Sequence, residues 1–322
     1  MQDVRVAVAG CGYWGKNLVR AMAGHGALVA VCDADPSVAA SFAEQYECAA
    51  RTWEEVLASD DVDAVVIAAP AALHRELAIA AVAAGKHVFV EKPIALTTGD
   101  ARAIVDAAAE HDRVLMVGHL LQYHAAFIAL RELVGRGELG ELRYIYSNRL
   151  NLGKVRREED SLWSFAPHDL SMVLALAGDV PTHVSARGHS YLNPGIADAT
   201  MTNLEFASGI GGHVFVSWLH PFKEQKLVVV GSEAMAVFDD LLGWDQKLAL
   251  YAHNIEWEQG QAIPTRADAT HVELTPSEPL ADECAHFLAA VRGDHPARTD
   301  GAEALRVLEV LERATASMKD QT

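Results

Sequence analysis

Short apolar runs alternate with amphipathic stretches from Val4 to about Gly118, and this pattern constrains the fold more than any other feature. The apolar runs resemble buried strands, and the stretches between them have helical periodicity. Strands separated by helices form a parallel sheet, because each return to the same end of the sheet needs a long crossover. Thr52 and Glu55 have capping-box spacing, which predicts the start of the third helix. The expected strands are Val4–Ala9, Leu28–Cys32, Ala64–Ala68, Val88–Val90 and Val114–Val117, and the expected helices are Trp14–Ala23, Ser37–Gln45, Trp53–Ala58, Leu73–Ala83 and Asp100–Glu110.

The pattern changes after about Leu120, where one helix over Ala125–Leu133 is followed by strands without long helices between them. Such a run predicts a meander or a large mixed sheet, and therefore a second, α+β domain. Two closing segments with helical periodicity, Ala281–Val291 and Ala302–Ala314, are expected to pack back on the first domain. The expected strands of the second domain are Leu142–Leu150, His183–His189, Thr200–Phe206, Gly211–Trp218, Lys226–Gly231 and Met235–Asp239.

Length and charge limit the classes of function. A chain of 322 residues exceeds the usual size of one hydrophobic core, so we expect two domains, over residues 1–120 and 121–322. A formal net charge of −18 argues against nucleic-acid partners, which need a basic face. The N-terminus lacks a signal-peptide pattern and no apolar run is long enough to span a bilayer, so we expect no membrane association. The irregular spacing of the four cysteines predicts neither a disulfide framework nor a zinc site and fits a cytoplasmic location.

A glycine-rich turn follows the first strand and opens the first helix, with the sequence Gly10-Cys11-Gly12-Tyr13-Trp14-Gly15. In a dinucleotide-binding turn, the first glycine permits the bend, the second lets the backbone approach a pyrophosphate, and the third lets helix and strand pack closely. Asp33 ends the second strand about 20 residues later, where a carboxylate accepts hydrogen bonds from ribose hydroxyls and repels a 2′-phosphate. The turn therefore predicts binding of NAD rather than NADP.

Lys92 lies two residues after the end of the strand Val88–Val90, which places it at the carboxyl edge of the sheet where open α/β folds bind ligands. With the glycine-rich turn, the segments Pro70-Ala71-Ala72-Leu73-His74, Glu91-Lys92-Pro93 and Pro167-His168-Asp169-Leu170 make the chain resemble the Gfo/Idh/MocA family of oxidoreductases over nearly its whole length.

The resemblance implies an α/β fold, with an N-terminal Rossmann domain and a C-terminal α+β domain that has a large open, mostly antiparallel sheet. The exposed face of that sheet commonly makes an oligomer contact in the family, so we expect a homodimer or a homotetramer. The implied cofactor-binding residues are Gly10, Gly12, Tyr13, Trp14, Gly15, Asp33, Ala69, Pro70, His74, Glu91, Lys92 and Pro93.

The resemblance also implies that Lys92 and His168 are the catalytic residues. Oxidation of a secondary alcohol needs a base for the hydroxyl proton, and an imidazole has a pKa suited to that role. The ammonium of Lys92 would then stabilise the developing alkoxide, although the two roles could be exchanged. Many sugar and inositol dehydrogenases of the family have Asp four residues before this histidine, whereas this chain has Ser164, which puts a standard triad in doubt.

A basic segment, residues 149–157, precedes His168 in an otherwise acidic chain and could grip an anionic substrate. This segment resembles family members that oxidise C3 of nucleotide-linked sugars such as UDP-N-acetylglucosamine, although a solvated loop paired with nearby carboxylates is an equal alternative. A dehydrogenase of a free sugar or inositol, a non-catalytic NAD-binding regulatory protein and an NAD-retaining glycosidase also remain open. No histidine spacing predicts a metal site. The expected substrate-binding residues are Tyr123, Arg149, Asn151, Arg156, Trp163 and His168.

Overall fold

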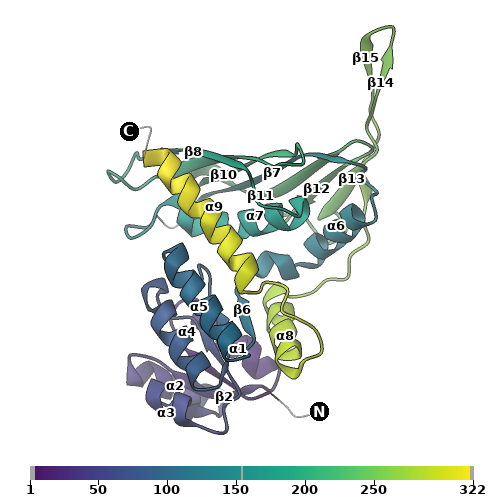
Figure 1. Ribbon diagram of the computed structural model, residues 1–322. Coiled ribbons are helices and arrows are strands. Elements are labelled where there is room, and N and C mark those ends of the chain that lie inside the picture. Colours follow the sequence, from purple (N-terminus) through teal and green to yellow (C-terminus); the bar gives the residue numbers. More distant parts are fainter. Residues whose placement is uncertain (1–3, 154, 320–322) are drawn as a thin grey trace. The chain divides into compact units, whose positions relative to one another are not determined.

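The computed structural model describes residues 4–153 and 155–319, and the chain divides into two compact units (Figure 1). Unit 1 contains the residues up to Tyr123 together with Ser277–Leu308. Unit 2 contains His124–Pro276 together with the residues from Glu309 onward. The chain therefore leaves unit 1, builds most of unit 2, and then returns to complete unit 1.

Unit 1 is built on a six-stranded parallel sheet with the order β3-β2-β1-β4-β5-β6. The strand order reverses direction between β1 and β4, so the sheet is doubly wound, with a ligand-binding crevice expected at that point. All of the expected strands and helices are present, with ends that differ by at most two residues. The strands are β1 (Val6–Ala9), β2 (Leu28–Cys32), β3 (Ala49–Ala50), β4 (Ala64–Ile67), β5 (His87–Val90) and β6 (Leu115–Val117), and the helices are α1 (Gly15–Gly24), α2 (Pro36–Tyr46), α3 (Trp53–Ala58), α4 (His74–Ala83) and α5 (Thr98–Glu110).

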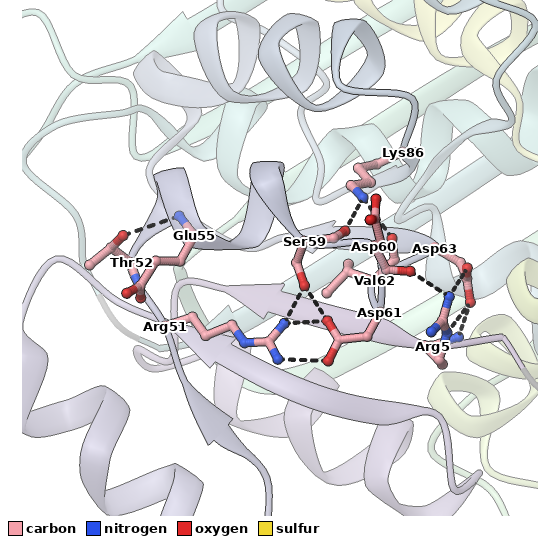
Figure 2. Close-up of polar contacts among 10 residues, drawn as sticks. All are labelled: Arg5, Arg51, Thr52, Glu55, Ser59, Asp60, Asp61, Val62, Asp63 and Lys86. Carbon is pink, nitrogen blue, oxygen red and sulfur yellow. Dashed lines mark hydrogen bonds and ion pairs between the residues drawn. The ribbon is translucent and has the colours of Figure 1, made fainter.

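Polar contacts fix the α3 region of unit 1 (Figure 2). The predicted capping box is present, because Thr52 accepts a hydrogen bond from the backbone N–H of Glu55 and the Glu55 carboxylate accepts one from the N–H of Thr52. Arg51 forms a two-pronged ion pair with Asp61. The buried ammonium of Lys86 donates to the backbone carbonyls that follow α3, which satisfies its charge with dipoles rather than a carboxylate.

The C-terminal part of unit 1 completes its hydrophobic core. Helix α8 (Pro279–Arg292) contributes Cys284, Phe287 and Leu288 to the cluster that includes the β1 side chains, and Phe287 meets Phe89 of β5 edge-to-face with ring centroids 5.7 Å apart. Thr299 then accepts a hydrogen bond from the N–H of Val117 in β6 at 2.8 Å. The parallel sheet is thus closed at one edge by residues from the end of the chain.

Unit 2 contains an eight-stranded sheet with the order β16-β13-β12-β11-β7-β10-β9-β8, in which only the β7–β10 pair is parallel among the described residues. The expected large, mostly antiparallel sheet is therefore confirmed. Its strands are β7 (Leu142–Leu152), β8 (His183–His189), β9 (Ala199–Glu205), β10 (Gly211–Ser217), β11 (Leu219–Gly231), β12 (Met235–Asp239), β13 (Leu248–Tyr251) and β16 (Thr270–His271).

Helices cover one face of this sheet. Helix α7 (Ser161–Ala177) packs on β7 and β10, and α6 (Ala125–Gly135) packs on α7 and β12. The last helix, α9 (Gly301–Lys319), reaches β8 through a hydrogen bond from the N–H of Ala186 to Ser317. Among the described residues, no helix has both the length and the apolar character needed to cross a membrane.

A separate two-stranded hairpin, β14 (Asn254–Glu258) and β15 (Gln261–Thr265), projects between β13 and β16 (Figure 1). Neither this hairpin nor β13 and β16 was expected from the sequence. Strand β11 also begins seven residues before the expected start at Lys226, because a register shift accommodates the segment around Pro221. A proline cannot donate to the ladder, so it is tolerated where such an irregularity leaves it unpaired.

Candidate active site

The glycine-rich turn requires glycine at its first and third motif positions for different reasons. Gly10 has a φ of +92°, and a Cβ at this position would lie 2.8 Å from the backbone of Ala68. A Cβ on Gly15 would lie 1.8 Å from the carbonyl oxygen of Gly10, closer than any real contact. Gly10 therefore permits the bend, and Gly15 permits α1 to pack against the turn, as the motif predicts.

The middle glycine faces open space. A Cβ on Gly12 would meet nothing within 4 Å among the described residues, so this position leaves room for a ligand to approach the backbone. The turn leads into the N-terminus of α1, where the side chain of the N-cap residue Trp14 makes no capping hydrogen bond with the described residues. Backbone N–H groups at such a helix end are suited to phosphate. The turn therefore fits the pyrophosphate of a dinucleotide.

Asp33 follows β2 and is tied to the same turn. Its Oδ2 accepts a hydrogen bond from the N–H of Cys11 at 2.7 Å, and its Oδ1 accepts one from the N–H of Asp35 at 3.0 Å. Each carboxylate oxygen can accept more than one hydrogen bond, so Asp33 still has acceptor capacity for ribose hydroxyls. Asp33 thus shapes the turn in addition to its predicted role in recognition.

A buried carboxylate connects the glycine-rich turn to the segment that carries Lys92. Glu91 accepts a hydrogen bond from the indole N–H of Trp14 and a second one, at 3.1 Å, from the backbone N–H of Lys92. Burial raises the pKa of Glu91, and the two hydrogen bonds and the Lys92 ammonium oppose this shift. Gly118 makes space for this carboxylate, because a Cβ there would lie 3.0 Å from it. Glu91 is therefore placed to position its neighbours.

Lys92 and Pro93 lie two and three residues after β5, and Ala69 and Pro70 lie two and three residues after β4, so all four lie at the carboxyl edge of the parallel sheet. Lys92 is partly exposed, as a residue that meets a ligand must be. Tyr13, in the glycine-rich turn, is 81% exposed and has the ammonium of Lys16 5.4 Å from its ring centroid. These residues fit the predicted cofactor side of the site.

His74 does not lie where the sequence analysis placed it. The side chain is only 1% exposed, and its two ring nitrogens lie 2.9 Å from the carbonyl oxygen of Pro93 and 2.8 Å from that of Ala69. Burial lowers the pKa of His74, which opposes charging of the ring. His74 therefore joins the two loops that follow β4 and β5 instead of lining a cofactor pocket with its own ring.

Glu283 of α8 is a buried residue that the sequence analysis missed. Both of its carboxyl oxygens lack a hydrogen-bond partner among the described residues, and burial raises its pKa well above the ordinary value, with a further contribution from Glu91. The one available signal was an acidic residue on the apolar face of the expected helix Ala281–Val291. Burial therefore disfavours the charged form of Glu283, which lies near the carboxylate that holds Lys92 and Trp14 in place.

Helix α7 of unit 2 carries His168, which is partly exposed, one turn after the buried Ser164. The neighbouring Asp169 is 1% exposed and accepts hydrogen bonds from Arg149 Nε at 2.6 Å and Arg149 Nη2 at 3.2 Å. Ser147 donates a further hydrogen bond to it at 2.6 Å. Because Ser147 and Arg149 belong to β7, this network fixes α7 on the sheet beside His168.

The predicted substrate residues of unit 2 differ in whether their polar groups already have partners inside the protein. Arg149 is largely neutralised by Asp169, and Arg156 forms an ion pair with Glu159 at 2.9 Å. Trp163 donates its indole N–H to Thr315 of α9 at 3.0 Å. Asn151 is partly exposed near the end of β7, while Lys154 of the predicted basic segment lies outside the described residues.

Tyr123 lies in the core of unit 1 and not at a binding surface. It is 2% exposed, and its hydroxyl lies 2.9 Å from Thr299 Oγ1. The guanidinium of Arg298 lies 5.0 Å from its ring centroid. Tyr123 is therefore placed as a core residue and not as a substrate residue, since its apolar body and its polar end both have partners inside the protein.

Comparisons with known proteins agree with the family resemblance. The family model described as an oxidoreductase family with an NAD-binding Rossmann fold matches residues 4–119, and the model of the Gfo/Idh/MocA C-terminal domain matches residues 127–237. An uncharacterized oxidoreductase from Streptococcus pneumoniae serotype 4 is 31% identical over 64% of this chain. This chain spans about 60% of the length of that relative.

Two further relatives align over nearly the full length. The UDP-N-acetylglucosamine 3-dehydrogenase of Acidithiobacillus ferrooxidans is 29% identical and aligns over 96% of this chain and 95% of its own. Its solved structure has a TM-score of 0.87 at 27% identity, with 99% of each chain covered. The inositol 2-dehydrogenase of Rhizobium meliloti is 27% identical over 99% of this chain and 98% of its own. The two matched domains cover most of the chain, so the protein belongs to the Gfo/Idh/MocA family of oxidoreductases, and its first unit is an NAD-binding Rossmann domain.

Proposed function

We propose that the protein is an NAD-dependent dehydrogenase that oxidises a secondary hydroxyl, at C3, of a nucleotide-linked sugar such as UDP-N-acetylglucosamine. The observation that carries the substrate class is the full-length similarity, in sequence and in structure, to a UDP-N-acetylglucosamine 3-dehydrogenase. The placement of Lys92 at the carboxyl edge of the Rossmann sheet supports the reaction type.

In the proposed mechanism, Lys92 and His168 act on the same substrate hydroxyl. Bound NAD supplies a nicotinamide ring that accepts hydride. His168 takes the hydroxyl proton, and the ammonium of Lys92 stabilises the negative charge that develops on the oxygen. Glu91 holds the Lys92 backbone, and Asp169 anchors the helix that carries His168, so both groups are oriented by buried neighbours. The network around Asp169 would supply the support that the family's usual aspartate gives, because Ser164 replaces that aspartate here.

The arginines favour a second candidate, a dehydrogenase of a free inositol or sugar. A pyrophosphate needs cations that are not already neutralised, yet Arg149 is bound to Asp169 and Arg156 to Glu159. An uncharged polyol requires no such cation, and an inositol dehydrogenase is among the relatives that align over the whole chain. The two substrate classes therefore differ in what they require of Arg156, whose ion pair with Glu159 is partly exposed and therefore weak.

A substrate comparison separates the candidates. NADH formation should be measured with UDP-N-acetylglucosamine, free N-acetylglucosamine and myo-inositol, each at several concentrations. The proposal predicts that kcat/KM is highest for the nucleotide-linked sugar and that Arg156→Ala reduces it while leaving the NAD affinity unchanged. Equal turnover of the free and nucleotide-linked sugars would reject the nucleotide requirement, and turnover of inositol alone would favour the second candidate.

We also propose that the protein forms a homodimer or a homotetramer through the uncovered face of the eight-stranded sheet. That face carries Tyr144, Tyr146, Met201 and Phe215, which are at least partly exposed. Such a cluster of aromatic and apolar side chains on one sheet face is typical of an interaction surface.

A further inference from the structure

The β14–β15 hairpin has one apolar face that the rest of the described chain leaves exposed. Directly paired residues lie on the same face of an antiparallel ladder, so the pairs Ile255↔Pro264 and Trp257↔Ala262 build that face. Trp257 is 73% exposed and Ile255 54% exposed. The opposite face contains Glu256, paired with Ile263, and Glu258, paired with Gln261.

A hairpin of this kind needs a partner. Among the described residues, its two five-residue strands pair only with each other, and an isolated two-stranded hairpin is marginally stable in water at best. In Figure 1 it rises from the β13 edge of the sheet on the side away from α6 and α7, which is the side of the uncovered sheet face. A molecule seated on that face would therefore lie beside the apolar face of the hairpin.

The same sheet face has a pocket at its other edge that is large enough for an aromatic side chain. A pocket of about 300 Å³ opens over β8, β9 and β10, and its lining includes Met201, Phe215, Arg187 and His189. An apolar cavity of roughly 150 Å³ admits benzene, so this pocket can take an indole ring. Arg187 could lie over the ring in a cation–π contact.

The hairpin and the pocket of its own chain lie at opposite edges of the eight-stranded sheet. Five strand spacings of about 4.8 Å separate β13 from β9, a distance of roughly 24 Å. Six residues separate Tyr251, at the end of β13, from Trp257, and a fully extended chain covers roughly 20 Å over that span. In contrast, a two-fold axis parallel to the strands places the β13 edge of one copy over the β8 edge of another.

We propose that the β14–β15 hairpin is a dimerisation arm that places Trp257 in the β8–β10 pocket of a second copy of this chain. The exchange is reciprocal, so each dimer contains two arms and two filled pockets and no site is left open for further growth. The inference does not depend on the reaction, because it concerns only the surface of unit 2.

The first test measures the mass of the full-length protein by sedimentation over a range of concentrations. Truncating a buried interfacial tryptophan weakens binding by about thirtyfold, and two arms are lost together, so Trp257→Ala should raise the dimer dissociation constant by about a thousandfold. Met201→Arg, which fills the pocket, should have a similar effect. Leu242→Ala, which removes an exposed apolar side chain elsewhere in unit 2, should leave the mass unchanged.

Mixing two variants provides a more specific test than the single substitutions. A mixture of Trp257→Ala and Met201→Arg should recover dimer to an intermediate degree, because the arm of the second variant fits the pocket of the first. A double variant, Trp257→Cys with Met201→Cys, should form a disulfide-linked dimer on mild oxidation, whereas neither single variant should. A monomeric wild-type protein, an unchanged dissociation constant in Trp257→Ala, or a disulfide formed within one chain would overturn the proposal. Dehydrogenase activity of the same variants is measured separately, so failure of the arm and failure of the proposed reaction remain distinct.

Discussion

Substituting the glycines of the first turn by alanine should separate cofactor binding from folding. Gly12→Ala adds a methyl group that meets nothing within 4 Å among the described residues, at a position without a left-handed φ. The folded protein should therefore be as stable as the wild type or slightly more stable, by up to about 1 kcal/mol, because alanine restricts the unfolded chain. The methyl group would instead occupy the space through which a pyrophosphate approaches the backbone.

The expected loss of affinity follows from one hydrogen bond to a charged group. Such a bond contributes about 1.5–3 kcal/mol, so the dissociation constant for NAD should rise by about ten- to 150-fold. Gly15→Ala should behave differently, because its Cβ would lie 1.8 Å from the carbonyl oxygen of Gly10 and the backbone itself must move. This second variant should lose about 1–3 kcal/mol of stability in addition to its affinity for NAD.

Two measurements test this reasoning. Calorimetric titration with NAD gives the dissociation constant, and urea denaturation gives the free energy of unfolding. Gly24→Ala serves as a control, because its Cβ would also meet nothing within 4 Å among the described residues but lies at the far end of α1. An unchanged NAD affinity in a stable Gly12→Ala variant would refute the assignment of this turn to the pyrophosphate.

Three further outcomes are expected. Lys92→Ala should abolish turnover while leaving the NAD affinity nearly unchanged, as calorimetry and NADH absorbance can check; undiminished turnover would remove Lys92 from the mechanism. Asp169→Ala should lower the free energy of unfolding by about 3–5 kcal/mol, because it leaves the largely buried side chain of Arg149 without its partner. The double variant Asp169→Leu with Arg149→Met should recover most of that loss in urea denaturation, and a loss below about 1 kcal/mol in the single variant would contradict this. The raised pKa of Glu283 means that its contribution to stability is present at acidic pH and is lost as the pH rises through the folded pKa. Above the pH range in which carboxyl groups ordinarily titrate, Glu283→Gln should therefore be more stable than the wild type. Parallel curves of unfolding free energy against pH for the two proteins would argue against this.

The first unit could be predicted from the sequence because local and tertiary preferences agree there. Strands β1 and β4 are short apolar runs in which every residue is buried, and α3 begins at a recognisable signal, the capping box of Thr52 with Glu55. The glycine-rich turn was predictable for the same reason, since Gly10 and Gly15 are required by steric contacts within a few residues of the chain or with the adjacent strand.

The environments of single polar residues could not be predicted in the same way. Whether Arg149 faces a ligand or a carboxylate depends on Asp169, which lies 20 residues away on a helix packed across the sheet. His74 was expected at the cofactor, but the loop after β5 supplies a carbonyl that holds its ring inside the protein. Tyr123 was expected near substrate, whereas Thr299, more than 170 residues away in sequence, accounts for its burial.

The hairpin was missed for another reason. Strand β14 alternates apolar and charged residues, as a half-buried strand does, but the covering layer that this pattern predicts is absent from the described part of the single chain. An alternating pattern predicts that the apolar face of a strand is covered, but it does not identify the element or the molecule that covers it.

The return of α8 to the first unit has a consequence for synthesis on the ribosome. The nascent chain emerges from its N-terminus, and roughly 150 residues separate Tyr123 from the segment that carries Phe287 and Leu288. At about 5–20 residues per second, the parallel sheet would wait roughly 8 to 30 s with one side of its core exposed. A gene fragment that stops near the first domain boundary would leave that exposure permanent, so the Rossmann half should aggregate when it is produced alone.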